Sequence, residues 1–255
     1  MIRPVLALWH REIVRFLRDR PRLTGSLLQP VVFWALFSGA LHGPQSFKPA
    51  GMDYGQYFFV GTLAMITLFT AIFATITVIE DRKEGFLQGV LVSSVPRSAI
   101  ALGKILGGAS LGLGLAVIFM LLAPLAGVSL SLDRVALGLA VLAVLAIAVT
   151  GLGFSLAWVM DSTAGYHGIM MLFLMPMLLL SGAFFPMESA HPLLAWIRFV
   201  NPMTYGVGAL RHAFQGEVPG VPPFATCMIG TVVFALATFA LGTLVVNRRS
   251  VRDVV

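Results

Sequence analysis

Six long apolar segments without a charged side chain constrain this fold more than any other feature of the sequence. They cover about residues 23–41, 57–79, 105–128, 135–160, 162–185 and 224–246, and none of them contains Asp, Glu, Lys or Arg. A helix needs roughly 20 apolar residues to cross the hydrocarbon core of a bilayer. Because backbone polar groups in lipid must bond to one another, each segment is expected to be helical. The sequence therefore predicts an all-α polytopic membrane protein with six transmembrane helices.

The few charged residues are distributed unevenly around these segments. Only 11% of the chain is charged, against about a quarter in a typical soluble domain. If both termini lie on one side, that side carries thirteen of the seventeen Lys and Arg residues, which is the bias of a cytoplasmic face. The other side carries Lys48, Arg134, Arg198 and Arg211. We therefore predict that both termini are cytoplasmic.

Residues 1–22 are predicted to form an amphipathic helix that lies in the membrane interface. An apolar face and a basic face recur there at helical spacing: Leu6, Trp9, Ile13 and Phe16, and Arg11, Arg15, Arg18 and Arg22. Such a helix buries its apolar face at the headgroup boundary and holds its Arg side chains near anionic lipid. The alternative is a basic lead-in to the first span with no defined helix.

A row of charged residues directly follows the second apolar segment: Glu80, Asp81, Arg82, Lys83 and Glu84. The loop that begins with this row is longer than a turn requires. Its apolar residues have the spacing of a short amphipathic helix, which Pro96 limits; they are Phe86, Leu87, Val90 and Leu91. We interpret the loop as a contact surface for another molecule. The alternative is that the charges only anchor a helix end at the lipid headgroups.

The stretch between the fifth and sixth spans, residues 186–222, is too broken to cross lipid and too apolar for a free loop. Residues 191–200 and 201–214 are predicted to form two short helices on the outer side. Asn201 is placed as the N-cap of the second helix, with Pro202 at its first helical position. These helices either contact a substrate or serve as a structural plug.

Glycines form a smooth face at the start of the third span. Gly103 and Gly107, and then Gly108 and Gly112, make two G-x-x-x-G steps, which Gly114 extends. Such residues let helix backbones approach closely. The face serves either packing within the chain or a seam between two copies.

No nucleotide-binding or hydrolytic motif occurs in the chain. Gly103-Lys104 is followed by Ile105 rather than by Ser or Thr, and G-x-x-x-x-G-K-[ST], H-E-x-x-H and G-x-S-x-G are all absent. We therefore expect no enzyme and no catalytic, cofactor-binding or metal-binding residue. His167 is the one histidine inside a predicted span. It is either a proton-relay group or a neutral imidazole bonded to a neighbouring helix.

Two stretches resemble signature motifs of the type-2 ATP-binding cassette (ABC) transporter permeases, the integral membrane subunits of bacterial exporters. They are EDRKEGFLQGVLVSSVPRSAIALGKILGG (80–108) and NPMTYGVGALR (201–211). The first resembles E-D-R-x-x-G-x-L-E-x-L-L-V-S-P-V-P-R, and the second resembles N-P-L-T-Y-x-V-D-x-L-R. Gln88, Ser94 and Gly208 depart from these patterns, where an acid, Pro and Asp are common. The order of elements extends the resemblance to nearly the whole chain.

The resemblance implies one permease domain over residues 1–255. Within it the interfacial helix occupies 1–22, the first five spans 23–185, the outer helices 186–222 and the sixth span 223–246. It also implies a dimer, expected to be a homodimer, that pairs with two copies of a separate ATPase in the bacterial plasma (inner) membrane. The outer helices are implied to close the exit.

The resemblance further implies that the ATPase contacts the N-terminal helix and the loop after the second span. The expected contact residues in the loop are Glu80, Asp81, Arg82, Lys83, Glu84, Gly85, Phe86, Leu87 and Leu91. Apolar members of this set would anchor the contact, and charged members would set its specificity. ATP hydrolysis is expected in the partner chain.

We expect export of an amphipathic, lipid-like or drug-like substrate, because spans without midplane charge would reject a bare ion or sugar. A substrate path is expected along Phe69, Phe73, Met170, Met171 and Met175, since Met adapts to varied surfaces; each of these is otherwise an ordinary packing residue. Two other functions stay open. An ion-gradient-driven secondary transporter would need acids inside the spans, and a membrane scaffold would transport nothing.

Overall fold

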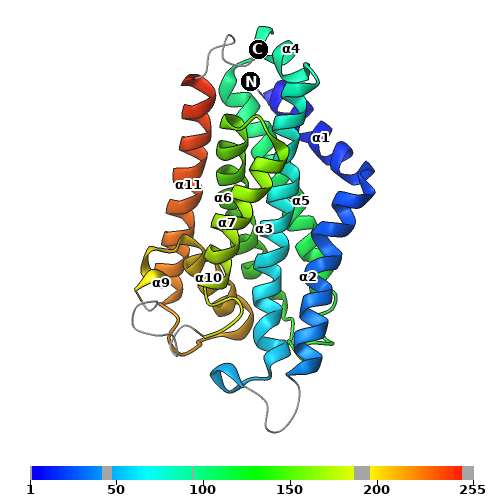
Figure 1. The fold of residues 1–255 in the computed structure, drawn as a ribbon. Helices are drawn as coiled ribbons and strands as arrows, with labels where there is room; N and C mark the ends of the chain where they lie inside the picture. The colour runs from blue at the N-terminus through cyan, green and yellow to red at the C-terminus, as the bar shows by residue number, and fades with distance from the viewer. Residues whose placement is uncertain (1, 42–47, 94, 187–195, 249–255) are drawn as a thin grey trace.

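The structure is a computed structural model that describes residues 2–41, 48–93, 95–186 and 196–248, and no strand occurs in these ranges. The long helices run side by side as one bundle (Figure 1). They are α2 (Arg20–Ala40), α3 (Tyr54–Lys83), α5 (Arg97–Met120), α6 (Leu132–Val159), α7 (Thr163–Leu179) and α11 (Phe224–Arg248). All of these except α7, which has 17 residues, are long and apolar enough to cross a membrane. The predicted all-α polytopic fold is confirmed.

Helix α3 forms the centre of the bundle. It packs against α2, α5, α6, α7 and α10 (Pro202–Gln215), and nearly all of its apolar residues are buried. Helix α2, by contrast, buries only Ser26, Pro30 and Trp34. Helix α3 therefore connects most of the elements of the bundle.

The short elements lie at the two ends of the bundle (Figure 1). At one end are α1 (Ile2–Arg18), α4 (Phe86–Val92) and the last turn of α11; we name it the termini-bearing end. At the opposite end are η1 (Pro49–Gly51), α9 (Ile197–Val200) and α10. The part of the helix predicted over 191–200 that precedes residue 196 lies outside the described residues.

Capping residues mark the starts of α10, as predicted from the sequence, and of α2. Asn201 caps α10, since its side chain accepts a hydrogen bond from the Met203 amide at 3.0 Å. Asp19 caps α2 in the same way, accepting from the Arg22 amide at 3.2 Å. The N-terminal helix therefore ends at Arg18 rather than at residue 22, because this cap begins a new helix.

Two helices extend further toward the termini-bearing end than the spans predicted from uncharged residues at 57–79 and 105–128. Helix α3 continues through the charged row to Lys83, and α5 begins at Arg97 instead of residue 105. Helix α5 also ends at Met120, and turns replace the predicted helix over 121–127. The charged residues do not end these helices, and most of them bond to neighbouring elements.

The fifth span is shorter than predicted, since α7 ends at Leu179 and not at residue 185. The chain turns at Gly182, whose φ is +85°. Its carbonyl accepts hydrogen bonds from the Tyr57 hydroxyl at 2.8 Å and from Arg211 at 2.6 Å. Gly61 makes room for this turn, because a Cβ there would lie 2.1 Å from the Ala183 carbonyl oxygen.

The glycine face of α5 receives α1. A Cβ on Gly103 would lie 2.8 Å from Leu8 Cβ, and one on Gly107 would lie 2.7 Å from Glu12 Cβ. Real Cβ atoms do not approach so closely, so both positions need glycine to keep α1 in place. Of the two open interpretations, packing within the chain is the one observed for this face. Gly114 meets nothing within 4 Å.

We predict that Gly103→Val displaces α1 and destabilises the chain by about 1–3 kcal/mol, the usual cost of overpacking. Gly114→Val is the matched control, because it makes the same exchange on the same helix in open space. Thermal unfolding in neutral detergent, with protease cleavage of the N-terminal region, measures both effects. Equal behaviour of the two variants would contradict the close approach of α1 to α5.

Candidate functional site

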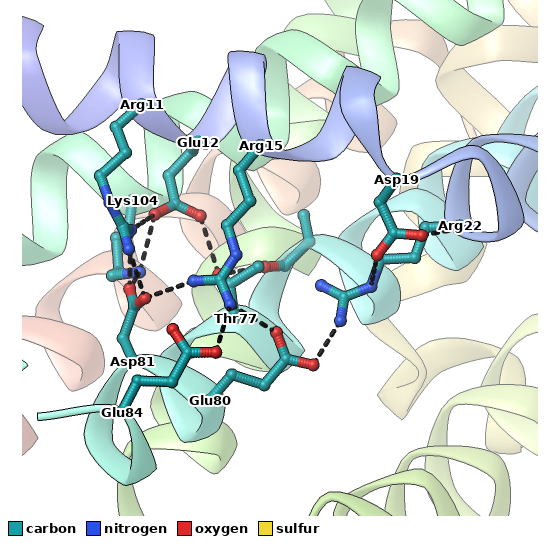
Figure 2. A network of polar contacts seen from close by, with 11 residues as sticks. Arg11, Glu12, Arg15, Asp19, Arg22, Thr77, Glu80, Asp81, Glu84 and Lys104 are labelled. Carbon is teal, nitrogen blue, oxygen red and sulfur yellow. Dashed lines mark hydrogen bonds and ion pairs between the residues drawn. The ribbon is translucent and has the colours of Figure 1, made fainter. Parts of the chain in front are cut away.

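The charged row lies on the last turns of α3, where helices α1, α2 and α5 bring side chains of opposite charge to it (Figure 2). We name the resulting group the ion cluster. Its members are Arg11, Glu12, Arg15, Arg22, Thr77, Glu80, Asp81, Glu84 and Lys104. The cluster occupies the termini-bearing end of an otherwise apolar bundle, so it is the most polar part of the interior.

Asp81 is the central acid of the cluster, and its side chain is 0% exposed. Arg11 grips both of its oxygens, with Nη1 donating to Oδ2 at 2.9 Å and Nη2 donating to Oδ1 at 2.7 Å. Lys104 Nζ donates to Oδ2 at 2.5 Å, and Arg15 donates to Oδ1. A buried carboxylate is stable only when paired and hydrogen-bonded, and these three cations meet that requirement.

Glu12 is a second buried acid, supplied by α1 and 3% exposed. It accepts hydrogen bonds from Lys104 Nζ at 2.8 Å and from Thr77 Oγ1 at 2.7 Å. Lys104 therefore bridges the acids of α1 and α3 from a third helix, α5. Removal of one partner of such a buried pair typically costs about 3–5 kcal/mol, so this bridge fixes the mutual position of the three helices.

The outer part of the cluster is weaker. Glu80 pairs with Arg15 at 3.0 Å and also with Arg22 at the start of α2. Glu84 accepts from Arg15 at 3.2 Å, but its side chain is 59% exposed. Exposed ion pairs contribute about 0–1 kcal/mol. The Asp81 and Glu12 contacts therefore dominate the stability of the cluster.

Arg82 extends the contacts to the other side of α3. It pairs with Asp161 at 2.7 Å, donates to the Met160 carbonyl at 2.9 Å and donates to the Trp158 carbonyl. These carbonyls belong to the end of α6 and the turn that leads to α7. Asp81 and Glu80 thus pair with cations from α1, α2 and α5. Arg82, on the other side of α3, bonds to the end of α6 and the turn that leads to α7.

Helix α4 joins the cluster through Arg11. The guanidinium carbon of Arg11 lies 3.7 Å from the centroid of the Phe86 ring, within the range of a cation–π contact. Burial by itself lowers the pKa of the Arg11 guanidinium, but the hydrogen bond and charge of Asp81 raise it above its usual value. Arg11 is therefore a fixed cation that links α4, α1 and α3.

The structure changes the roles expected for the coupling residues. Asp81, Arg82 and Leu87 are buried within the chain, so they have almost no surface to offer to another protein. The accessible surface of this region consists instead of Lys83, Glu84, Gly85, Gly89, Val92 and Ser93. Val92 is 77% exposed and was not among the expected contacts. Phe86 and Leu91 are half-buried.

The structure shows which residues of the N-terminal helix pack against the rest of the chain. The buried residues of α1 are Val5, Leu8, Glu12 and Phe16, whereas Leu6, placed on the apolar face, is 53% exposed. Trp9 is half-buried and donates to Ser110 Oγ at 3.0 Å. Arg11 and Arg15 turn inward to Asp81 instead of outward to lipid, while Arg18 stays exposed. Glu12, on the buried face, pairs with Lys104 at 2.8 Å.

The expected path residues do not form one surface. Phe69 and Met170 are buried in the bundle, Met175 is half-buried and Met171 is 40% exposed. Phe73 lines an open groove of about 470 Å³, and Arg22, Glu80 and His167 line the same groove. His167 packs against the Phe73 ring, with the ring centroids 5.9 Å apart.

Sequence reasoning missed three members of the cluster: Glu12, Thr77 and Lys104. One signal was available, because Glu12 is the only acid among the basic and apolar residues of α1. Lys104 directly precedes the third predicted span, which begins at residue 105, yet it is 3% exposed. Thr77 gave no signal, since threonine is common in apolar helices and usually bonds its own backbone.

The sequence is similar to a known family and to several named proteins. The sequence profile described as "ABC-2 type transporter" matches residues 3–214. Nodulation protein J of Neorhizobium galegae is 24% identical over 258 residues, which cover 96% of this chain and 93% of the relative. Nodulation protein J of Rhizobium leguminosarum bv. viciae is 26% identical, with 97% and 95% covered. The protein ycf38 of Porphyra purpurea, provisionally named a transport permease, is 22% identical, with 84% and 75% covered.

We predict that Asp81→Asn destabilises the chain by about 3–5 kcal/mol, because it removes the shared acid of the buried Lys104 and of the half-buried Arg11 and Arg15. Adding Lys104→Met removes one of these cations and should restore part of the loss. Lys83→Gln, an exposed neighbour in the same row, is the control and should change stability little. Thermal unfolding of the parent chain, the two single variants Asp81→Asn and Lys104→Met, their double variant and Lys83→Gln measures the coupling. Additive effects of Asp81→Asn and Lys104→Met would contradict the ion cluster.

Proposed function

The chain belongs to the ABC-2 type transporter family, and from this premise we propose that it is the membrane-spanning permease subunit of an ABC exporter. Family membership and the several apolar helices establish a multi-pass membrane permease of an ABC transporter. Direction, substrate and partner are the proposed part. Residues 1–255 act as one permease domain in this proposal, because its long helices pack as one bundle.

The proposed motor is a separate ATPase, bound in two copies to a homodimer of this chain. The sequence has no Walker A motif of its own, so hydrolysis needs another polypeptide. The ATPase approaches the termini-bearing end, which we place in the cytoplasm of a bacterial plasma membrane because Lys and Arg gather there. Its docking surface is the exposed side of α4 with Lys83 and Glu84.

The observation that carries this proposal is the burial of Asp81 among cations from two other helices. Because α1, α3 and α5 share the contacts of Asp81 and Glu12, they move as one body when α4 is pushed. Arg11 links that body to α4 through Phe86. The charged row therefore transmits force inside the permease, while the neighbouring exposed residues receive it from the ATPase.

The proposed substrate is amphipathic, lipid-like or drug-like. The central parts of the spans carry no acid or base, so they offer no partner for a bare ion. Phe73, in the groove that Arg22, Glu80 and His167 also line, is the best placed of the proposed path residues. A substrate with an apolar body and a polar head fits a groove of this mixed character.

The decisive variant is Val92→Asp. A carboxylate at this exposed apolar position should reduce the stimulation of the partner ATPase at least tenfold, because apolar burial supplies much of the affinity of such a contact. Leu132→Asp is the matched control, since Leu132 is also exposed, at 84%, but belongs to the opposite end. Co-purification and ATPase rates in liposomes measure the effect. Reversal of Glu80 or Asp81 is less informative, because it dismantles the ion cluster.

Other results would point elsewhere. If Val92→Asp and Leu132→Asp stimulate the ATPase equally, α4 is not the docking surface. If the purified chain moves solute in liposomes without an ATPase, the protein is a secondary transporter. If no substrate changes the rate of a co-purified ATPase, the protein is a scaffold.

A further inference from the structure

A small cavity lies at the opposite end of the bundle, between α10, α3 and the turn that follows α7. Its volume is about 50 Å³, and its polar lining includes Tyr57, Ser181, Arg198, Thr204 and Arg211. No Asp or Glu of the described residues lines it. A water molecule needs about 10–15 Å³ on this measure, so the cavity holds a few waters or one compact polar group.

Arg211 is the first cation of this cavity, and it is 1% exposed. Its guanidinium donates to the carbonyls of Tyr57 at 3.1 Å and Gly182 at 2.6 Å, and to Gln215 Oε1 at 2.9 Å. Its guanidinium carbon lies 3.5 Å from the Tyr57 ring centroid. All of these partners are neutral groups, so the positive charge is solvated but not balanced. Burial lowers the pKa of Arg211 to about 10, which still leaves it protonated at neutral pH.

Two further donors of the cavity have no hydrogen-bond partner. They are Thr204 Oγ1 and Arg198 Nε, and both atoms are buried. Thr204 as a whole is 8% exposed. A buried polar atom without a partner costs about 1–3 kcal/mol, and native structures seldom leave two of them in one place.

We propose that this cavity binds one phosphate-sized oxyanion. An oxyanion accepts hydrogen bonds from Arg198 and Thr204 and balances the buried charge of Arg211. Water satisfies donors but does not neutralise the buried charge of Arg211, and a sugar ring is too large for the volume. Arginine with hydroxyl donors is also the usual protein environment of phosphate groups. The oxyanion is either a free ion or the phosphate of a lipid headgroup, and both sources share this chemistry.

The test is binding of inorganic phosphate to the purified full-length chain in neutral detergent. Phosphate should raise the unfolding temperature and bind in calorimetry, whereas chloride at equal ionic strength should do neither. The double variant Arg198→Gln with Thr204→Val should weaken binding at least tenfold, since it removes both unpartnered donors. Arg134→Gln is the matched control, because this exposed arginine lies at the same end and donates to Ser129 Oγ at 2.9 Å. We avoid Arg211 variants because that side chain also holds α10 to α3.

A second arm separates the two sources. Phosphatidylglycerol in mixed micelles should compete with inorganic phosphate if the natural ligand is a lipid headgroup, and should have no effect if it is the free ion. Either result supports the site. Three results would overturn it: no phosphate binding to the parent chain, equal binding to the double variant, or equal stabilisation by chloride.

The inference goes beyond the proposed export function and does not depend on it. The measurement needs neither the ATPase nor transport, so the two proposals fail separately. The site can exist in a permease whose motor docks elsewhere, and docking at α4 can hold without an oxyanion here.

Discussion

The carboxylate of Asp81 lies at the end of the central helix with no exposed surface, and the architecture of the termini-bearing end depends on how it is neutralised. Arg11 and Arg15 come from α1 and Lys104 from α5. A charge in a low-dielectric interior is tolerated only with such partners. The three helices must therefore keep their mutual positions, and glycines on α5 let α1 come close enough to reach the acid.

The charged row consists of a buried part and an exposed part. Asp81 and Arg82 hold neighbouring elements together inside the chain, whereas Lys83 and Glu84 face outward beside α4. In the proposed coupling, the surface that receives force must be connected to rigid elements if the motion is to travel further. The Arg11 contacts with Phe86 and Asp81 provide that connection. Burial of the central acid is what makes the connection stiff.

The opposite end uses a different device. There Arg211 is buried without an acid of the described residues beside it, and backbone carbonyls of the turn after α7 receive its hydrogen bonds. Those carbonyls are available because α7 stops at Leu179. One end of the bundle therefore balances its charges internally, while the other leaves a positive cavity. This asymmetry between the ends is the basis for expecting an oxyanion at the second.

The sequence by itself determined the helices, their order and the N-cap at Asn201, because hydropathy, periodicity and capping are local properties. It also marked the charged row as unusual. Only the tertiary structure decided what those charges do: Glu12 and Lys104 are 92 residues apart, and Arg11 and Asp81 are 70 apart. No local pattern encodes such pairs. They arise when packed helices exclude water and leave each buried charge to find a partner elsewhere in the chain.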